Sequence, residues 1–364
     1  MLDRFGRSKW LAIVAVAGMT VAACTGGATP EPSPAPSTAP ASAEPSAEPS
    51  ADPKAARDQI CAEAAAEEGE LVYWSNFANP DPILDAFKAT YPGIDVQDLA
   101  NHPDDFVQAM LTEISAGRPP SADIMYGELN VLKPLIDLEA IDDSIDWPSY
   151  GVSDELIPPP ANVVRLYRIA GGIVYNTNNH SPEDLPDTWE ELIDPQWQNQ
   201  IVVDPRGRPF DQLSLVWGAD ETIDYVTRLN ELSPIVIKGG TAGMLAVASE
   251  QAAITTGGRS AETLEQQDAG APLDIKYLDV ITTLDTFNMV PKDAAHPKAA
   301  ICMVSWLATD GQAIHDEAEF KSNVTVPPGT PEGAQFSDVE TTEDADAVKD
   351  IGEQIGEIFA GTGG

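Results

Sequence analysis

Short continuous apolar runs alternate along the chain with apolar residues at helical spacing, starting near residue 55. The short runs predict buried strands, and spacings of three and four, as for Ile83, Leu84 and Phe87, predict helices. The pattern predicts a helix at 55–68, a strand at 71–74, a helix at 82–90, a strand at 94–96, a helix at 106–114 and a strand at 122–126. This order predicts a parallel sheet with right-handed crossovers and helices on both faces.

The alternation returns after residue 170. Apolar runs predict strands at 171–176, 201–205, 235–237, 252–256 and 285–290, and helices at 185–192, after Thr241, at 299–307 and at 345–359. The last helix carries Val348, Ile351, Ile355 and Ile358 on one stripe, so we expect its apolar face to pack on the fold. The fold class is therefore α/β, with parallel-rich sheets flanked by helices.

Polar residues follow most predicted strands, at the ends where α/β sheets bind ligands. Loops that lead into helices there offer backbone N–H groups, and arginine grips carboxylates and phosphates bidentately. The candidates at these ends are Ser75, Asn76, Glu128, Arg206, Arg208, Thr241, Thr256, Gly258 and Arg259. Other roles stay open for these residues. Ser75 and Asn76 could simply form a turn, and the arginines could be solvated cations in surface loops. Glu128 could pair with one of the arginines or bind an ammonium group.

The N-terminus has its own pattern. Arg4, Arg7 and Lys9 precede an apolar stretch at 10–21, and small residues then lead to Cys24. This order predicts a secretion signal at 1–23 and lipidation of Cys24, with a buried core cysteine as the alternative. Residues 24–53 hold eight prolines among Ala, Ser, Glu, Thr and Gly, which predicts a disordered stalk. We therefore expect an extracytoplasmic protein that is lipid-anchored to the cell membrane.

The net charge of the chain limits its partners, and its length indicates how many lobes it forms. The whole chain carries a net charge of −39, and removal of residues 1–23, which carry a net +2, would make it −41. Such acidity argues against nucleic acid as a partner and against adhesion to anionic lipid. The roughly 310 residues after the stalk are more than one core usually serves, which predicts two lobes.

Two further cysteines, Cys61 and Cys302, lie in the expected globular part. Export out of the cytoplasm favours a disulfide between them over free thiols. Metal ligation is the weaker alternative, because neither has a Cys or His neighbour at ligand spacing. No metal site or cofactor is expected.

Several segments together resemble bacterial extracellular solute-binding proteins of ABC importers, in the branch that includes iron(III)-binding receptors. The resemblance covers about residues 55–330 and rests on segments 71–76, 121–126, 172–177, 186–189, 296–300 and 310–312. It implies a type II periplasmic-binding-protein-like fold, with two lobes joined by crossing strands near 172–176 and 283–287. Lobe 1 would be 54–172 plus 286–364 and lobe 2 would be 173–285, with the ligand in the cleft between them.

The resemblance implies a monomeric receptor that captures a small solute and delivers it to an ABC permease. It also adds Tyr175, in a crossing strand, to the ligand-binding candidates. In the iron branch an acid in the position of Glu128 ligates metal, and adjacent tyrosines follow the strand that is here 252–256. This chain has Thr255, Thr256 and then Gly257 instead. An anionic or zwitterionic organic solute, such as a carboxylate or phosphonate, is therefore expected, with iron(III) as the alternative.

The sequence also bears on two other function classes. For an enzyme, the sequence contains no Gly-x-Ser-x-Gly elbow, His-Glu-x-x-His motif or phosphate-binding Gly-Lys-Ser/Thr loop, so a non-catalytic protein is expected. A receptor that presents its ligand to a signalling partner would share the same fold and remains an alternative.

Overall fold

A computed structural model describes residues 52–159, 161–324, 326–339 and 341–361. The predicted signal peptide, Cys24 and nearly all of the predicted stalk lie outside these ranges. Helix α1 (Pro53–Glu67) begins within the range that we predicted as stalk, and Asp52 caps it by accepting a hydrogen bond from the Lys54 N–H. Proline suits the first position of a helix, where its missing N–H costs nothing.

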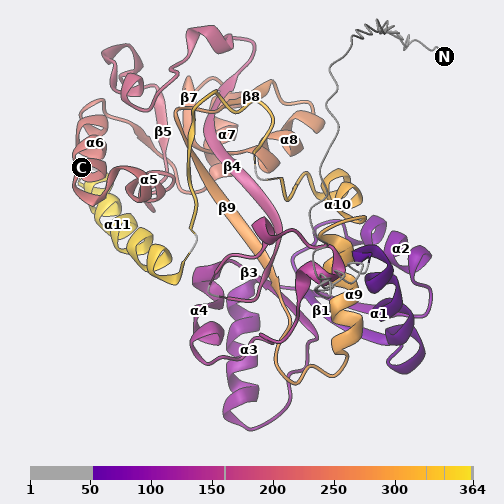
Figure 1. The fold of residues 1–364 in the computed structure, drawn as a ribbon. Coiled ribbons are helices and arrows are strands. Elements are labelled where there is room, and N and C mark those ends of the chain that lie inside the picture. Colours follow the sequence, from indigo (N-terminus) through magenta and orange to yellow (C-terminus); the bar gives the residue numbers. More distant parts are fainter. Residues whose placement is uncertain (1–51, 160, 325, 340, 362–364) are drawn as a thin grey trace, which may run out of the picture. The chain divides into compact units, whose positions relative to one another are not determined.

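The described strands form one sheet, which Figure 1 shows running through the molecule. In spatial order it contains β2 (Asp95–Ala100), β1 (Glu70–Ser75), β3 (Ile124–Gly127), β9 (Val280–Met289), β4 (Val164–Asn176), β7 (Ile254–Arg259), β5 (Ile201–Val203) and β6 (Ile235–Val236). Two more strands lie off this path: β10 (Gln335–Ser337) pairs with β9, and β8 (Leu273–Lys276) pairs with β4. β1 is parallel to β2 and β3, as the sequence predicted, and β5 is parallel to β6 and β7.

Two long strands cross between these parallel groups. β4 and β9 run antiparallel, from Val164 opposite Asn288 to Gly171 opposite Thr282. Both include the crossings predicted near 172–176 and 283–287, although β4 begins earlier than the apolar run alone indicated. The α/β class with two crossing strands is confirmed, and the crossing strands bring the carboxyl ends of both parallel groups to one region.

The helices agree with the pattern in most places. Predicted and observed helices correspond at α1, α2 (Pro80–Thr90), α3 (Pro103–Ser115), α7 (Gly240–Ala248), α9 (Pro297–Leu307) and α11 (Thr342–Ala360). The helix expected after Glu128 is α4 (Leu129–Asp137). The pattern did not identify α5 (Phe210–Trp217), α6 (Ala219–Glu231), α8 (Ser260–Asp268) or α10 (Gln312–Glu319). Within the described ranges, no helix combines the length and apolar character needed to cross a membrane.

The helix predicted at 185–192 is wrong. Only short 3₁₀ turns form there, at Pro182–Asp184, Glu190–Ile193 and Pro195–Trp197. Side chains capture the backbone donors that an α-helix would use, because the Asp187 N–H donates to Glu191 Oε2 and the Glu191 N–H donates to Thr188 Oγ1. Pro195 then disfavours helical backbone at Asp194.

Separate apolar clusters occupy the two ends of the crossing strands. One end packs Trp147 and Trp306, and a neighbouring cluster there contains Trp74, stacked on Phe106 with ring centroids 4.7 Å apart. The other end packs around Trp189, whose indole N–H donates to the Val280 carbonyl at 2.7 Å. Trp74 and Trp189 are therefore both core residues.

Helix α11 packs with the second cluster. Ile351, Ile355 and Phe359 are buried there beside Trp189. The apolar stripe of α11 does pack on the fold, as we expected. It packs, however, against the part that we proposed as lobe 2, whereas we had assigned residues 286–364 to lobe 1. We therefore propose that α11 belongs to lobe 2 and leave the other proposed boundaries unchanged.

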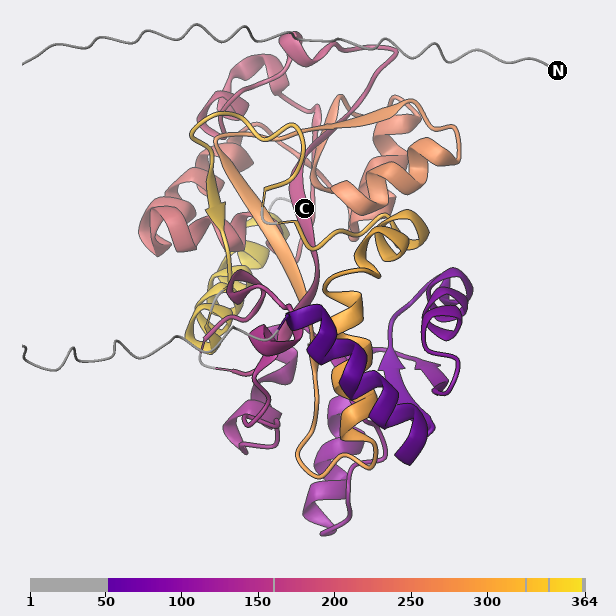
Figure 2. The ribbon, with the colours of Figure 1, turned by 45° about the vertical axis from the view of Figure 1, so that its right-hand side comes forward.

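The cysteines of α1 and α9 form a disulfide. Cys61 and Cys302 are fully buried, and their Cα atoms are 5.1 Å apart. Figure 2 shows the two helices lying against each other. The bond closes a sequence separation of 241 residues, which lowers the chain entropy of the unfolded state.

Removal of this bond is expected to destabilise the protein. A Cys61→Ala, Cys302→Ala double variant should lose about 2–5 kcal/mol of unfolding free energy, measured by urea denaturation under oxidising conditions. Dithiothreitol should lower the stability of the wild type and leave the double variant unchanged. Equal stability of the two proteins without reductant would show that the crosslink does not stabilise the fold.

Candidate functional site

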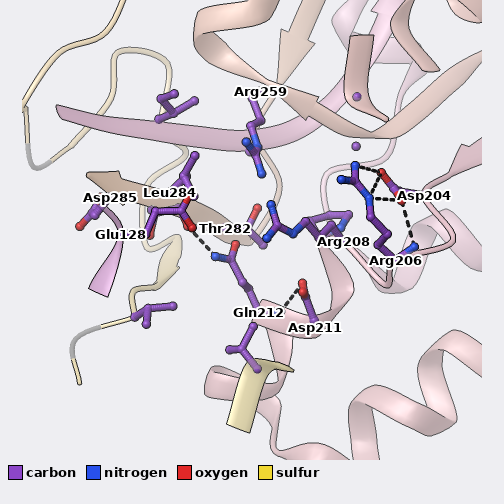
Figure 3. Close-up of a pocket in the computed structure, with 18 of the residues that line it drawn as sticks. Glu128, Asp204, Arg206, Arg208, Asp211, Gln212, Arg259, Thr282, Leu284 and Asp285 are labelled. Carbon is purple, nitrogen blue, oxygen red and sulfur yellow. Dashed lines mark hydrogen bonds and ion pairs between the residues drawn. The ribbon is translucent and has the colours of Figure 1, made fainter. Parts of the chain in front are cut away.

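A cavity of about 220 Å³ lies where the crossing strands meet the carboxyl ends of β3, β5 and β7. Its walls come from β4 and β9, the loop from Asp204 to Gln212, the starts of α4 and α7, the end of β7 and the start of α11. Figure 3 shows the polar side chains that line it. A site at strand ends is the arrangement that the sheet order predicts.

Most of the candidates from the sequence come together here. The seven residues that line the cavity are Glu128, Arg206, Arg208, Thr241, Thr256, Gly258 and Arg259. They come from four separate segments of the chain, so the fold and not sequence proximity gathers them. Glu128 lies at the end of β3, on the opposite side of β4 and β9 from β5 and β7 in the sheet order.

The other three candidates do not line the cavity. Ser75 is fully buried and its hydroxyl accepts the Phe77 N–H, while the Asn76 amide donates to the Tyr167 hydroxyl at 2.8 Å. Tyr175 is buried in the cluster around Trp189, and its hydroxyl donates to Asp274 at 3.3 Å. Burial raises the pKa of Tyr175 to about 12. Ser75 and Asn76 therefore stabilise the loop after β1, and Tyr175 stabilises the core around Trp189.

The Arg206 guanidinium forms an ion pair with a carboxylate of the protein. Its Nε and Nη2 atoms donate to Asp204, with the shortest contact at 2.6 Å from Nη2 to Oδ2. Burial alone would raise the pKa of Asp204, but hydrogen bonds from Arg206 and from the Gly239 N–H outweigh it and lower that pKa. Arg206 therefore borders the cavity with its charge largely balanced.

Arg208 and Arg259 are differently placed. In Figure 3 their guanidinium groups point toward the same part of the cavity, whereas Arg206 turns to Asp204. Among the described residues no hydrogen bond or ion pair engages Arg208, and the nearest acid to Arg259 is Glu262, at 3.9 Å from Nη1 to Oε1. That distance is too long for a hydrogen bond. Two guanidinium groups thus keep their donors available to a ligand.

Backbone and hydroxyl groups complete this part of the cavity. Gly240 and Thr241 begin α7, whose first N–H groups have no partner within the helix. Thr256 donates its hydroxyl to the Val202 carbonyl at 3.3 Å, so the sheet uses that group. Gly258 is required for packing, because a Cβ there would lie 2.1 Å from Val174 Cγ2.

Asp211 is an acid at this site that the sequence did not indicate. It is 6% exposed and lines the cavity beside Gln212, whose Nε2 donates to the Thr283 carbonyl at 2.6 Å. Burial raises the pKa of Asp211 to about 6, against the opposing effects of Arg208, the Gln212 N–H and Arg259. The only hint in the sequence was its position three residues after Arg208 in a polar loop.

Residues of β9 and of the C-terminal segment also line the cavity. These are Thr282, Thr283, Leu284, Asp285 and Phe287, followed by Val339, Ala345 and Val348. The apolar stripe of α11 predicted that this helix packs on the fold. Nothing in the local sequence indicated that its first turns would line this cavity.

The donor set at this site is poor in metal ligands. Among the described residues no group of three or more His, Cys, Asp or Glu side chains is placed to hold a metal ion. Tyr277, the first tyrosine after β7, lies in a separate small cluster with Ala170 and Ile281. The Glu128 side chain makes no hydrogen bond or ion pair with a described residue, so its carboxylate is available to a cationic group.

Residues 74–314 match the family described as bacterial extracellular solute-binding protein. No curated protein matches the chain. Among solved structures, iron-bound HitA from Pseudomonas aeruginosa is 18% identical, with 81% of this chain and 99% of that one covered and a TM-score of 0.59. The family match and this structural likeness agree with the resemblance seen in the sequence.

Two further structures extend the comparison. AfuA from Actinobacillus pleuropneumoniae, with exogenous fructose-6-phosphate bound, is 16% identical, with 78% and 97% of the chains covered and a TM-score of 0.56. The spermidine/putrescine ABC transporter substrate-binding protein PotD from Streptococcus pneumoniae is 18% identical, with 80% and 100% covered and a TM-score of 0.57. At these identities the likeness shows the fold alone, and it confirms the predicted type II periplasmic-binding-protein fold.

The raised pKa of Asp211 has a measurable consequence for stability. Its folded pKa of about 6 exceeds the unfolded value of about 3.9, so the folded state loses stability as the pH rises from about 4 to about 6. Asp211→Asn should match the wild type at pH 4 and exceed it by about 2–3 kcal/mol at pH 7.5, measured by urea unfolding.

Asp204→Asn is the matched control. The pKa of Asp204 is lowered, so its carboxylate stabilises the folded state at neutral pH, and the variant should be less stable there than the wild type. A wild-type pH profile for Asp211→Asn would contradict the assignment.

Proposed function

The chain belongs to the bacterial extracellular solute-binding protein family, whose members capture small solutes for an ABC importer, and we propose that its own solute is a small organic anion or zwitterion. A carboxylate or a phosphonate would bind in the cavity at the crossing strands, with its acidic group at Arg208 and Arg259. The protein would act as a monomer and pass the solute to the permease in the membrane.

The observation that carries this proposal is the convergence of two guanidinium groups without hydrogen-bonded protein partners in one cavity. A planar guanidinium presents paired donors that match the two oxygens of a carboxylate or phosphonate. The N-terminal end of α7 lines the same cavity, and its free N–H groups also favour negative charge. Five acids line the cavity as well. Asp204 pairs with Arg206, Asp285 pairs with Arg165 and Arg168, and Glu262 lies 3.9 Å from Arg259, whereas Glu128 and Asp211 form no ion pair with a described residue.

Glu128 supports the zwitterionic form of the proposal. Its carboxylate borders the same cavity and is half-buried. A ligand with an ammonium group at one end could meet Glu128 while its acidic group meets the arginines.

Iron(III) is the second candidate. Solved structures of similar fold include iron-bound HitA and the Trichodesmium protein FutA in complex with iron and citrate, and AfuA was solved with a sugar phosphate. Glu128 and Asp211 would offer the hard oxygen donors that iron(III) favours, but tyrosine is absent from the described cavity lining. The lining therefore favours the organic anion.

We further propose that the protein is held at the outer face of the cell membrane through a lipidated Cys24. This rests on the basic and apolar segment before Cys24 and on the proline-rich residues after it. A tether of that composition would let the receptor turn and dock on its permease.

The arginines can be tested directly. Arg208→Ala and Arg259→Ala should each weaken the binding of carboxylates and phosphonates about 10- to 100-fold, because each removes charge-assisted hydrogen bonds worth about 1.5–3 kcal/mol. The measurement is calorimetric titration of the full-length protein with acetate, butyrate, methylphosphonate, 2-aminoethylphosphonate, putrescine and iron(III).

Arg228→Ala is the control, since Arg228 pairs with Glu190 and Asp224 on the surface of α6. It should bind every probe as the wild type does. Unchanged anion binding in Arg208→Ala, or tight iron(III) binding with a visible charge-transfer band, would overturn the anion assignment.

Lipidation is a separate prediction. Cells that express the wild type and are fed radiolabelled palmitate should label the protein, and Cys24→Ala should abolish the label and release the protein from the membrane fraction. Cys61→Ala serves as the control because Cys61 is fully buried in the fold. Membrane retention of labelled Cys24→Ala would disprove the anchor.

A further inference from the structure

The C-terminal segment gives the cavity an apolar side, and we infer that Val339, Ala345 and Val348 select organic anions that carry a hydrocarbon part over smaller anions. This rests on the proposed function and specifies the class of solute. The three residues line the cavity but lie beyond residues 74–314, so the family match does not assign them.

The segment is fixed at its start by the crossing strands. β10 pairs with β9, from Gln335 opposite Val280 to Ser337 opposite Thr282. Asp338 then accepts a hydrogen bond from Thr283 Oγ1 at 2.9 Å and pairs with Arg168 Nη2 at 3.0 Å. Val339 follows immediately, so its position at the cavity is set by the strands that form the cavity wall.

Helix α11 begins at the cavity. Thr341 and Asp344 form a capping box, with the Asp344 N–H donating to Thr341 Oγ1 at 3.1 Å and the Thr341 N–H donating to Asp344 Oδ2 at 2.8 Å. This cap fixes where the helix starts. Ala345 and Val348 are three residues apart and therefore share one face, which is the face that lines the cavity.

The same face continues into the core. Ile351, Ile355 and Phe359 follow Val348 at helical spacing and are buried with Trp189. The helix is thus held by packing along its second half, and its first turns are left to face the cavity.

Helix α11 also supports the arginine loop. A Cβ on Gly352 would lie 3.3 Å from the Arg206 carbonyl, and a Cβ on Gly356 would lie 2.9 Å from the Pro205 carbonyl. The loop that carries Arg208 therefore rests on the backbone of α11 in close contact. One helix thus fixes both the cationic loop and the apolar wall, which sets the distance between an acidic head group and a hydrocarbon contact.

Apolar side chains from other elements extend this wall. Leu129 opens α4, which α11 contacts, and Leu284 comes from β9. Val339, Val348 and Leu284 are all half-buried. A ligand that covered them would remove apolar surface from water, which favours binding by about 0.8 kcal/mol for each buried methylene.

The test compares two series of probes, the n-alkyl carboxylates from acetate to valerate and the n-alkylphosphonates from methyl to butyl, by calorimetry on the full-length protein. Each added methylene is expected to tighten binding about 3- to 4-fold. In a Val339→Thr, Val348→Thr double variant, which keeps the side-chain shape, the gain should fall below 2-fold per methylene. Acetate and methylphosphonate should bind the double variant as tightly as the wild type.

The control is Val326→Thr, because Val326 is exposed and lies outside the cavity lining. This variant should keep the wild-type increase in affinity for each added methylene. Three outcomes overturn the inference alone: no chain-length gain in the wild type, an unchanged gain in the double variant, or loss of acetate and methylphosphonate binding in the double variant with its circular dichroism preserved. Absence of binding for every probe overturns the proposed function and this inference with it.

Discussion

The antiparallel pairing of β4 with β9 is the contact on which the rest of the structure depends. Arg168 and Asp285 face each other in its register and pair twice, from Nε at 2.9 Å and from Nη2 at 2.7 Å, with Arg165 also at 3.0 Å from Asp285. Burial alone would lower the pKa of Arg168, but Asp285 and Asp338 outweigh it and raise that pKa. Because a one-residue slip would leave buried charges uncompensated, this register is strongly preferred, and it places the ends of β3 and β7 around one cavity.

The cavity gathers arginines and acids in one place. The protein is strongly acidic, yet three of its 20 basic residues line one small cavity. Asp204 pairs with Arg206, Glu262 lies 3.9 Å from Arg259, and Arg208 has no ion pair with a described residue. Any attraction of Arg208 and Arg259 for an anion therefore acts at short range, since salt screens charge interactions over about 10 Å.

The sequence predicted the local elements well where the pattern was regular. The parallel order of β1, β2 and β3 and the candidates at the ends of β3, β5 and β7 followed from apolar runs and the residues after them. The helix at 185–192 was wrong because side chains and proline compete with its backbone hydrogen bonds. Ser75 and Asn76 also stand at a strand end, but their side chains are used by neighbouring residues, and a one-dimensional pattern does not show which strand ends converge.

By itself the sequence determined the α/β class, the alternation of elements and the chemistry available at each strand end, since these depend on residues close together in the chain. Only the tertiary structure decided which ends share a cavity, that Asp204 occupies Arg206, and that burial raises the pKa of Asp211. It also decided that Val339, Ala345 and Val348 face residues more than 130 positions earlier in the chain. Burial and charge pairing depend on neighbours in space, and the register of β4 on β9 and the packing of α11 on its glycines create those neighbours only when the chain folds.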